Sequence, residues 1–411
     1  MKSYLEAVIL DNFRNIKFAM LTFDRGLSII YGNNAQGKTN VIEGIYLFAV
    51  GKSFRGAKDR DLIRFGSDRA QANIVFHDST RMNEMGYRVF AEETRRKKEL
   101  FLNRVKKKSM NEMLGNFHAA LFCPEHLSIV KDEPALRRNF LDNAICQLKP
   151  TYVRALSEYG KVLEQRNSLL KNHEEYSPEQ FESMMEILDE KFVDSGSFIT
   201  VTRAKYLRRL FEYANKYMQD MTMGAESLSF EYLCSITDYG ENNYEDFSYV
   251  KNTYFIRLAD KKERERFAGL SLSGAHRDDF VIYLNGKNAK LYCSQGQQRS
   301  IALALKLAEG ELSRECTGEY PVFLLDDVFS ELDKRRKEYI MSGFGDRQII
   351  LTTCEKNDFA DVHDALKIET EDGKFRFTEG LERQFEYDLT EEEKASFEDT
   401  FADDDSIDFT G

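Results

Sequence analysis

The sequence has few cysteines and prolines and no long apolar run, and each shortage excludes a class of protein. Its six cysteines are scattered over 411 residues without CxxC or Cys/His spacing, which predicts reduced thiols rather than disulfides or a zinc site. With 5 prolines and 24 glycines, the chain is neither collagen-like nor broadly disordered. No apolar run approaches the ~18 residues of a membrane span, and the first residues, MKSYLEAVILDNFRN, lack the features of a secretory signal. We therefore expect a cytoplasmic protein that does not enter a membrane.

The net charge of −12 is concentrated near the end of the chain. Residues 386–411 carry eleven carboxylates and one lysine, a net charge of −10, which leaves −2 for residues 1–385. This acidic tail has few apolar anchors and is expected to be disordered. It is either a solvated, solubilising end or an autoinhibitory strip that competes with nucleic acid for a basic surface. Because the body is nearly neutral, the overall acidity does not argue against a nucleic-acid partner.

The pattern of apolar residues predicts an α/β fold in which an α/β head is split in sequence by a mainly helical insert. Short strands are expected over the first 30 residues, and helices over residues 151–222, with a break around residues 171–180. Strands return near residues 227–236 and before Asn285-Gly286, a hairpin turn signal. The predicted divisions are the first half of the head (1–150), a helical lobe (151–270), the second half of the head (271–385) and the acidic tail (386–411).

A glycine-containing loop between an expected strand and an expected helix predicts a phosphate-binding site. The segment GNNAQGKT at residues 32–39 fits G-x-x-x-x-G-K-[ST], in which backbone N–H groups surround phosphate oxygens. Lys38 is expected to reach the β and γ phosphates and Thr39 to ligate Mg²⁺, while the helix that starts near Lys38 directs its positive end at the same anion. The predicted ATP-binding residues here are Gly32, Asn33, Asn34, Ala35, Gln36, Gly37, Lys38, Thr39 and Asn40.

A second apolar segment, PVFLLDD at residues 321–327, predicts a buried strand in the middle of a parallel sheet. It brings two carboxylates to the edge where such sheets bind ligands. Asp326 is expected to hold Mg²⁺, and Asp327 to orient or deprotonate the attacking water. The alternative is a pair of helix-capping acids at a strand exit, which the phosphate-binding loop makes the weaker interpretation. Lys38 and Asp327 are thus the predicted catalytic residues.

The segment Ser294-Gln295-Gly296-Gln297 stands directly before an amphipathic helix and is similar to the signature motif of ABC ATPases. A hydroxyl, a glycine that permits close approach and a helix N-terminus together form a second anion pocket. Such a pocket completes a nucleotide site only on a partner subunit, so it implies an ATP-sandwiched homodimer. Taken alone, the segment is also typical of a capped helix start. The residues assigned to this motif are Ser294, Gly296 and Gln297, and the following SELD (330–333) matches the D-loop, with Asp333 expected at the partner.

Residues 95–108, RRKKELFLNRVKKK, hold eight cations and one glutamate across an expected hairpin. Spaced cations match a phosphate backbone, and the lack of interleaved aromatic residues beyond Phe101 favours contact that is independent of sequence. The alternative is a solvated edge strand that lysines protect from aggregation. The predicted DNA-binding residues are Arg95, Arg96, Lys97, Lys98, Arg104, Lys106, Lys107 and Lys108.

These motifs lie in a chain that resembles the RecF family of DNA replication and repair ATPases, which are related to SMC proteins. The resemblance rests on segments that follow in order over about residues 1–355, of which SGAHRDDF (273–280) is far more specific than a phosphate-binding loop. The other segments are DNFRN (11–15), GNNAQGKTN (32–40), GKSFRG (51–56), FCPEHL (122–127), PALRRNFLD (134–142), EQRNSLLK (164–171), SQGQQRS (294–300) and LLDDVFSELD (324–333).

The resemblance implies a head (lobe I) with a helical lobe II in place of a long coiled coil. It implies ATP and Mg²⁺ as cofactors, an ATP-dependent homodimer, and slow, DNA-stimulated hydrolysis. It implies binding to single- and double-stranded DNA at gaps or junctions, and partnership with RecR, RecO and a RecA-type recombinase in recombinational repair. It puts Arg14 near the adenine side of the nucleotide and Arg55 on the dimer side.

Two departures from the ABC pattern bear on hydrolysis. Asp327 stands where most ABC ATPases have glutamate, which shortens the reach by one methylene and suggests slow turnover. The switch histidine expected after the last strand is missing, and LTTC (351–354) stands there, with Thr353 as the candidate γ-phosphate sensor. Two other functions are compatible with the motifs. One is the ATPase subunit of a membrane transporter, which the helical insert disfavours, and the other is an ATP-dependent scaffold that barely hydrolyses.

Overall fold

The computed structural model describes residues 3–379 except 92–97, 132, 238–242, 330–331, 344, 346, 355–358, 360–361 and 363. The predictions for the acidic tail, for residues 330–331 of the D-loop, and for Arg95, Arg96 and Lys97 fall outside these residues. All six cysteines are free thiols, as the sequence predicted. Within the described part of the chain, no helix combines the length and the apolar character that crossing a membrane requires.

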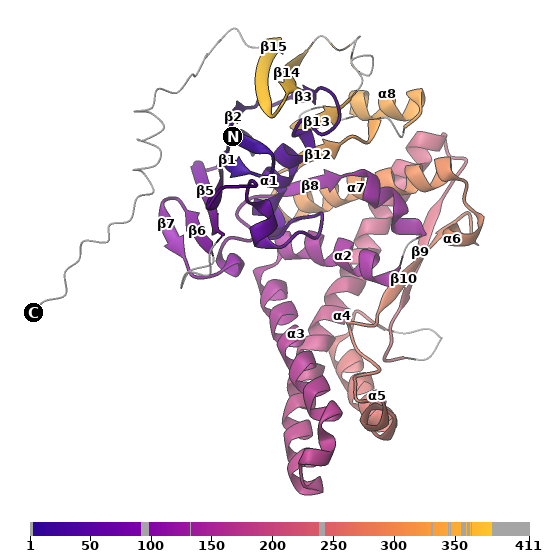
Figure 1. Ribbon diagram of the computed structural model, residues 1–411. Coiled ribbons are helices and arrows are strands. Elements are labelled where there is room, and N and C mark those ends of the chain that lie inside the picture. The colour runs from indigo at the N-terminus through magenta and orange to yellow at the C-terminus, as the bar shows by residue number, and fades with distance from the viewer. Residues whose placement is uncertain are drawn as a thin grey trace, which may run out of the picture.

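A mixed six-stranded sheet forms the centre of the head (Figure 1). Its strands run in the order β15-β14-β3-β13-β12-β8, and all neighbours are parallel except β15 with β14. β3 (Leu27–Tyr31) lies between β13 (Ile349–Thr353) and β14 (Ala365–Glu371), so segments from both sides of the helical region join in one sheet. The remaining strands are β8 (Ala119–Phe122), β12 (Val322–Asp326) and β15 (Lys374–Glu379).

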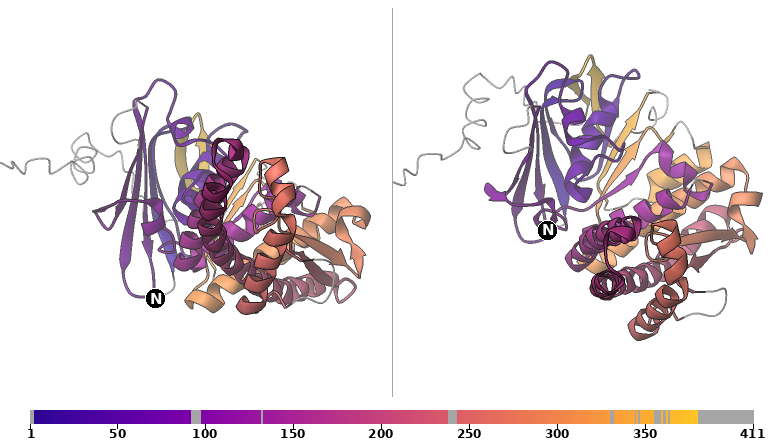
Figure 2. Two further views of the ribbon diagram at one scale, coloured as in Figure 1. Left: turned by 90° about the horizontal axis from the view of Figure 1, so that it is seen from below. Right: turned by 60° about the horizontal axis from the view of Figure 1, so that its bottom comes forward.

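An antiparallel sheet in the order β2-β1-β4-β5-β6-β7 covers one side of the central strands (Figure 2). Helix α1 (Lys38–Val50) packs between the two sheets, because Val41 shares one apolar core with Leu10 of β1 and Leu324 of β12. A Cβ on Gly44 would lie 2.7 Å from Cδ2 of Leu10, so a larger residue here would force the Leu10 side chain to shift. The strands are β1 (Tyr4–Phe13), β2 (Ile16–Thr22), β4 (Arg69–His77), β5 (Met82–Phe90), β6 (Lys98–Leu102) and β7 (Val105–Lys107).

Long helices pack on the opposite face of the central sheet and extend away from it (Figures 1 and 2). α3 (Pro150–Lys171) packs against α4 (Pro178–Thr222), and α5 (Phe247–Ala268) contacts both. The predicted break between the first two helices is confirmed, because α4 begins with a capping box in which Oγ of Ser177 accepts from the N–H of Gln180. The other helices of this layer are α2 (Pro134–Leu148) and α7 (Gln295–Thr317).

A three-stranded sheet in the order β11-β10-β9 lies beside these helices. The hairpin predicted at Asn285-Gly286 is present, and both residues have the positive φ, 49° and 74°, that a type I′ turn needs. The strands are β9 (Leu228–Leu233), β10 (Asp279–Leu284) and β11 (Lys287–Asn288), and two further helices are α6 (Ala289–Tyr292) and α8 (Lys334–Gly343).

The GAHRDD segment, which leads into β10, connects helices α3 and α4 to the three-stranded sheet through buried hydrogen bonds. Nδ1 of His276 lies 2.8 Å from the hydroxyl of Tyr159 on α3, and burial lowers the pKa of His276 to about 4. Asp278 accepts hydrogen bonds from the hydroxyls of Thr200 on α4 and Tyr232 on β9. The specificity of this segment therefore reflects buried polar packing of the helical layer rather than a second catalytic centre.

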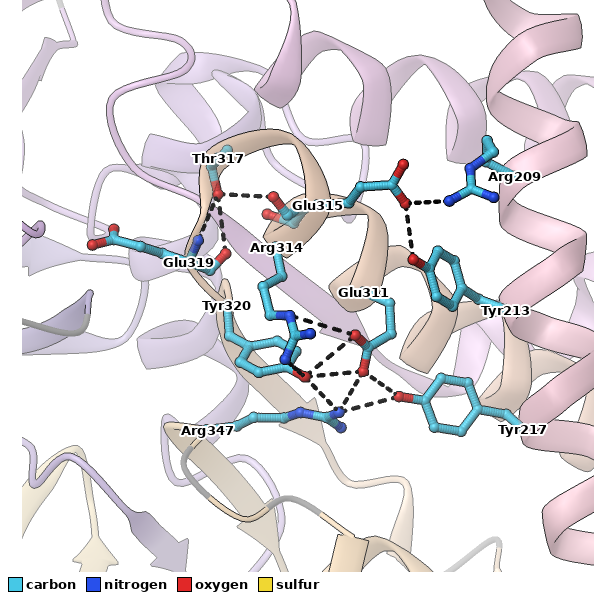
Figure 3. A network of polar contacts seen from close by, with 11 residues as sticks. Arg209, Tyr213, Tyr217, Glu311, Arg314, Glu315, Thr317, Glu319, Tyr320 and Arg347 are labelled. Carbon is cyan, nitrogen blue, oxygen red and sulfur yellow. Dashed lines mark hydrogen bonds and ion pairs between the residues drawn. The ribbon is translucent and has the colours of Figure 1, made fainter.

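A polar network fixes α4 to α7 and to the segment before β13 (Figure 3). Tyr217 donates from its hydroxyl to Oε1 of Glu311 at 2.6 Å, and Arg347 pairs with the same oxygen at 2.6 Å. Arg209 pairs with Glu315 at 2.7 Å. Because both glutamates belong to α7, the helix that follows the signature motif is tied to the 45-residue α4.

Candidate nucleotide-binding site

The phosphate-binding loop connects β3 to α1 in the shape that its glycines allow. Gly32, Ala35 and Gly37 all have positive φ, at 155°, 64° and 105°. A Cβ on Gly32 would lie 2.3 Å from the carbonyl oxygen of Thr370, so no other residue fits there. The ammonium of Lys38 is folded into the loop and donates to the carbonyl oxygens of Gly32 and Asn33, each at 2.7 Å.

Side chains around the loop hold this shape from outside. Asn15 donates from Nδ2 to the carbonyl oxygen of Ala35 at 3.0 Å and accepts at Oδ1 from Nδ2 of Asn40 at 2.6 Å. Thr370 donates to the carbonyl oxygen of Gln36 at 3.0 Å. Because both faces of the loop are hydrogen bonded, its backbone N–H groups are preorganised for an anion.

Arg14 lies at the edge of the loop, and its guanidinium binds other groups of the same chain. It forms a bidentate ion pair with Glu43 of α1, at 2.9 and 2.6 Å, and donates to the carbonyl oxygen of Asp61 at 2.8 Å. Arg55 donates to Oδ1 of Asn40 at 3.1 Å and lies 3.7 Å from Glu43. The contact of Arg14 with adenine and the dimer contact of Arg55 stay predictions.

The two predicted magnesium ligands come together across the central sheet. Oδ1 of Asp326, at the end of β12, accepts from the hydroxyl of Thr39 at 3.0 Å and from the hydroxyl of Thr352, on β13, at 2.7 Å. Asp326 is buried, and desolvation raises the pKa of its carboxyl. One carboxylate and one hydroxyl beside a phosphate site are ligands that suit Mg²⁺, which takes its other ligands from phosphates and water. No group of three or more His, Cys, Asp or Glu side chains suited to a metal ion occurs among the described residues.

Asp327 faces the same space from a left-handed backbone conformation, with φ at 51°. Its N–H is held by the hydroxyl of Thr352 at 3.0 Å. Sγ of Cys354 lies 2.7 Å from Oδ1 of Asn34 and 3.7 Å from Oδ1 of Asp327, and burial raises the pKa of the Cys354 thiol. Cys354 therefore contacts the site, whereas Thr353, the predicted sensor, is buried within β13.

These residues surround a cleft of about 830 Å³, which lies within the usual size range of small-molecule sites. Arg14, Asn34–Asn40 and Asp327 were predicted to take part in the site, and all line this cleft. Sequence reasoning missed Ile63, Arg64 and Phe65 on the same wall, because an ordinary loop sequence gives no signal of a pocket. Asn15, Arg55 and Asp61 complete the lining.

The signature residues do not line this cleft. Ser294 is exposed and caps α7, with its Oγ accepting from the N–H of Gln297 at 3.3 Å. Gln297 also donates from Nε2 to Glu226 at 2.7 Å. Gly296 lies near the guanidinium of Arg336, and the backbone N–H of Arg336 donates to Oδ1 of Asp333 at 2.9 Å. The two predicted anion pockets are thus separate surfaces of one chain.

The predicted basic hairpin is present as β6 and β7, but carboxylates neutralise part of its charge. Lys98 pairs with Asp59 at 3.0 Å. Arg104 lies 3.4 Å from Glu84, and Lys106 pairs with Glu99 at 2.5 Å. Lys107 and Lys108 form no ion pair within the described residues. Among the cations of the hairpin that the structure describes, these two are therefore the least compensated.

This chain is similar to known proteins over nearly its whole length. The family model described as RecF/RecN/SMC N terminal domain matches residues 4–376. DNA replication and repair protein RecF of Acetivibrio thermocellus is 37% identical over 375 residues, which cover 90% of this chain and 99% of that protein. The protein of the same name from Listeria welshimeri is 36% identical over 367 residues, covering 89% of this chain and 96% of that one.

The fold of this chain is also similar to those of solved structures. A structure described as the recombination mediator protein RecF-ATP in the RecFOR pathway has a TM-score of 0.84 at 34% identity and covers 92% of this chain and 98% of that one. The Smc head domain derived from Pyrococcus furiosus has a TM-score of 0.52 at 17% identity, covers 92% of this chain and 96% of that one, and is similar in fold alone.

The split sheet, the phosphate-binding loop and the paired aspartates define a head domain of the RecF/RecN/SMC type. Within that class, the identity and coverage show that the chain belongs to the RecF family.

Proposed function

We propose that this chain is an ATP-dependent DNA-binding protein of recombinational repair and replication restart. The observation that carries the proposal is that Lys38 and Thr39 line one cleft and Asp326 is hydrogen bonded to Thr39, in a chain of the RecF family. A relative at 34% identity is described with bound ATP, which supports ATP as the ligand of the cleft. On this proposal, ATP joins two copies around DNA, and hydrolysis releases them.

The contacts of the loop suggest how the triphosphate is held. Lys38 exchanges its bonds to the carbonyl oxygens of Gly32 and Asn33 for bonds to phosphate oxygens, while the helix N-terminus faces the same anion. Thr39 and Asp326 would hold Mg²⁺, which would neutralise charge on the phosphates. Asp327 orients the attacking water from the far side of the γ-phosphate. Its short side chain makes hydrolysis slow.

The exposed position of Ser294 supports a site that two copies complete together. Each copy offers a cleft with Lys38 and, on another surface, a helix N-terminus capped by Ser294. In a two-fold symmetric dimer both pairs meet at once, so the dimer binds two nucleotides. The basic hairpin supplies sequence-independent contacts to DNA gaps or junctions, and RecR, RecO and a RecA-type recombinase are the proposed protein partners.

Sedimentation with ATP, with ADP, and with ATP plus gapped DNA tests this proposal. We expect a dimer with ATP, a monomer with ADP, and a dimer on DNA with ATP. A monomer under all three conditions would refute the ATP-driven dimer. Single-turnover hydrolysis with and without gapped DNA separates a DNA-stimulated ATPase from a scaffold that barely hydrolyses.

Ser294→Arg is expected to leave ATP binding intact and to prevent the ATP-dependent dimer, because a long side chain enters the place of the partner's γ-phosphate. Light scattering with saturating ATP measures the dimer, and a fluorescent ATP analogue measures binding. Ser294→Asp is the matched variant, since aspartate caps a helix as well as serine but repels a phosphate. A normal dimer in both variants would exclude the signature role.

Charge reversal at Lys106, Lys107 and Lys108 to glutamate is expected to weaken binding to DNA of any sequence by about tenfold or more and to flatten its salt dependence. Binding curves at several salt concentrations measure both effects. Reversal of three exposed lysines of α3 and α4, Lys161, Lys171 and Lys191, changes the net charge equally and serves as the control. Equal losses of DNA affinity in both variants would show that DNA does not bind specifically at the hairpin.

A further inference from the structure

Two side chains at the carboxyl end of β13, Thr352 and Cys354, contact residues of the proposed catalytic site. Thr352 donates to Asp326, the proposed magnesium ligand. Cys354, two residues further on, reaches Asn34 of the phosphate-binding loop, with 2.7 Å between Sγ and Oδ1. The same sulfur lies 3.7 Å from Oδ1 of Asp327. Cys354 therefore stands between the loop and the residue proposed to orient water.

The chemistry of these groups fixes which way the Asn34 amide faces. A protonated thiol has one S–H to donate, and the amide oxygen of asparagine is an acceptor. When the thiol binds Oδ1, the amide nitrogen Nδ2 faces away from Cys354 and keeps its two N–H donors for a ligand. Asn34 lines the cleft together with Lys38 and Asp327, so such a ligand is the end of the bound triphosphate.

We propose that Cys354 is a positioning residue for ATP hydrolysis, whose thiol orients the Asn34 amide so that Nδ2 donates to the γ-phosphate in the transition state. Asn34 is then the residue that touches the nucleotide, and Cys354 acts through it. This inference rests on the proposed ATPase function. The switch histidine of ABC ATPases is missing after β13, and the inference assigns a role in hydrolysis to Cys354 in this segment. Cys354 thereby takes the place of Thr353, which the sequence had suggested as the γ-phosphate sensor.

Three variants test the role of the S–H donor. Cys354→Ala removes the donor and is expected to lower the single-turnover rate by about tenfold, with ATP affinity changed by less than about twofold. Cys354→Ser keeps a donor and is expected to stay within about threefold of the unmodified protein. Cys316→Ala, at an exposed cysteine of α7, is the control that should change nothing. Thermal unfolding verifies that all three variants are folded.

A double-mutant cycle with Asn34→Ala tests whether Cys354 acts through Asn34. If it does, Cys354→Ala has no further effect on the rate once Asn34 is alanine, whereas independent roles give multiplied losses. A wild-type rate in Cys354→Ala, an equally slow Cys354→Ser, or multiplied losses in the double variant would overturn the inference. If the unmodified protein does not hydrolyse ATP at all, the proposed function itself fails, which is a different result from these three.

Discussion

Lys38→Ala is expected to abolish ATP binding, with an affinity loss of at least about a hundredfold. Lys38 is buried, and its ammonium donates to two carbonyl oxygens of the phosphate-binding loop, which hold it inside the loop. A charge-assisted bond from such a group to a phosphate is among the strongest polar contacts that a protein makes. Alanine removes that bond and leaves the glycine-rich backbone to hold the anion alone.

Titration with a fluorescent ATP analogue, followed by competition with unlabelled ATP, measures this loss. Lys216→Ala, which removes an exposed lysine of α4, is the matched control and should bind ATP normally. Thermal unfolding without nucleotide should be similar for the two variants. If Lys38→Ala bound ATP with normal affinity, the cleft would not be the nucleotide site.

Asp327→Asn is expected to slow hydrolysis by about a hundredfold or more while it preserves ATP binding. The amide cannot accept a proton from water or orient it as a carboxylate does. Asparagine is also one of the few residues that tolerate the left-handed backbone found here, with φ at 51°. The variant should therefore fold normally and accumulate as an ATP-bound dimer.

Light scattering with ATP and Mg²⁺ follows that dimer over time, and quenched single turnovers give the rate. Asp327→Glu provides the comparison, since it restores the longer carboxylate of most ABC ATPases and should keep measurable hydrolysis. A monomeric Asp327→Asn protein, or one that hydrolyses ATP at the normal rate, would count against the role given to Asp327.

The parts of the site that follow from local chemistry could be predicted from the sequence. The GNNAQGKT loop needs positive φ at its glycines and a strand and helix on its two sides, and residues 32–39 have all of these. The apolar segment before Asp326 could only be an inner strand, and β12 indeed lies between β13 and β8. The hairpin at Asn285-Gly286 and the break before Ser177 follow from turn and capping residues in the same way.

The parts that depend on neighbours across the fold could not be predicted from local patterns. Thr352 and Cys354 are the exception, because Thr352 lies near the carboxyl end of the buried strand β13 and Cys354 directly follows it, at the sheet edge where Asp326 also lies. The wall formed by Ile63, Arg64 and Phe65 carries no such signal. Nor does the sequence near the basic hairpin reveal that Asp59 and Glu84 lie against Lys98 and Arg104.

The place of β3 in the central sheet has a consequence for synthesis of the protein. Among the described residues, β3 pairs with β13 and β14 alone, and these strands leave the ribosome roughly 300 residues later, so a long stretch of chain is made before they are available. The phosphate-binding loop is made early, yet Asp326 and Thr352 reach it only after β12 and β13 have been made. A nascent chain cut short before β13 would thus carry the motif without β13 and β14, the strands that flank β3, and nucleotide binding would report that translation had passed β13.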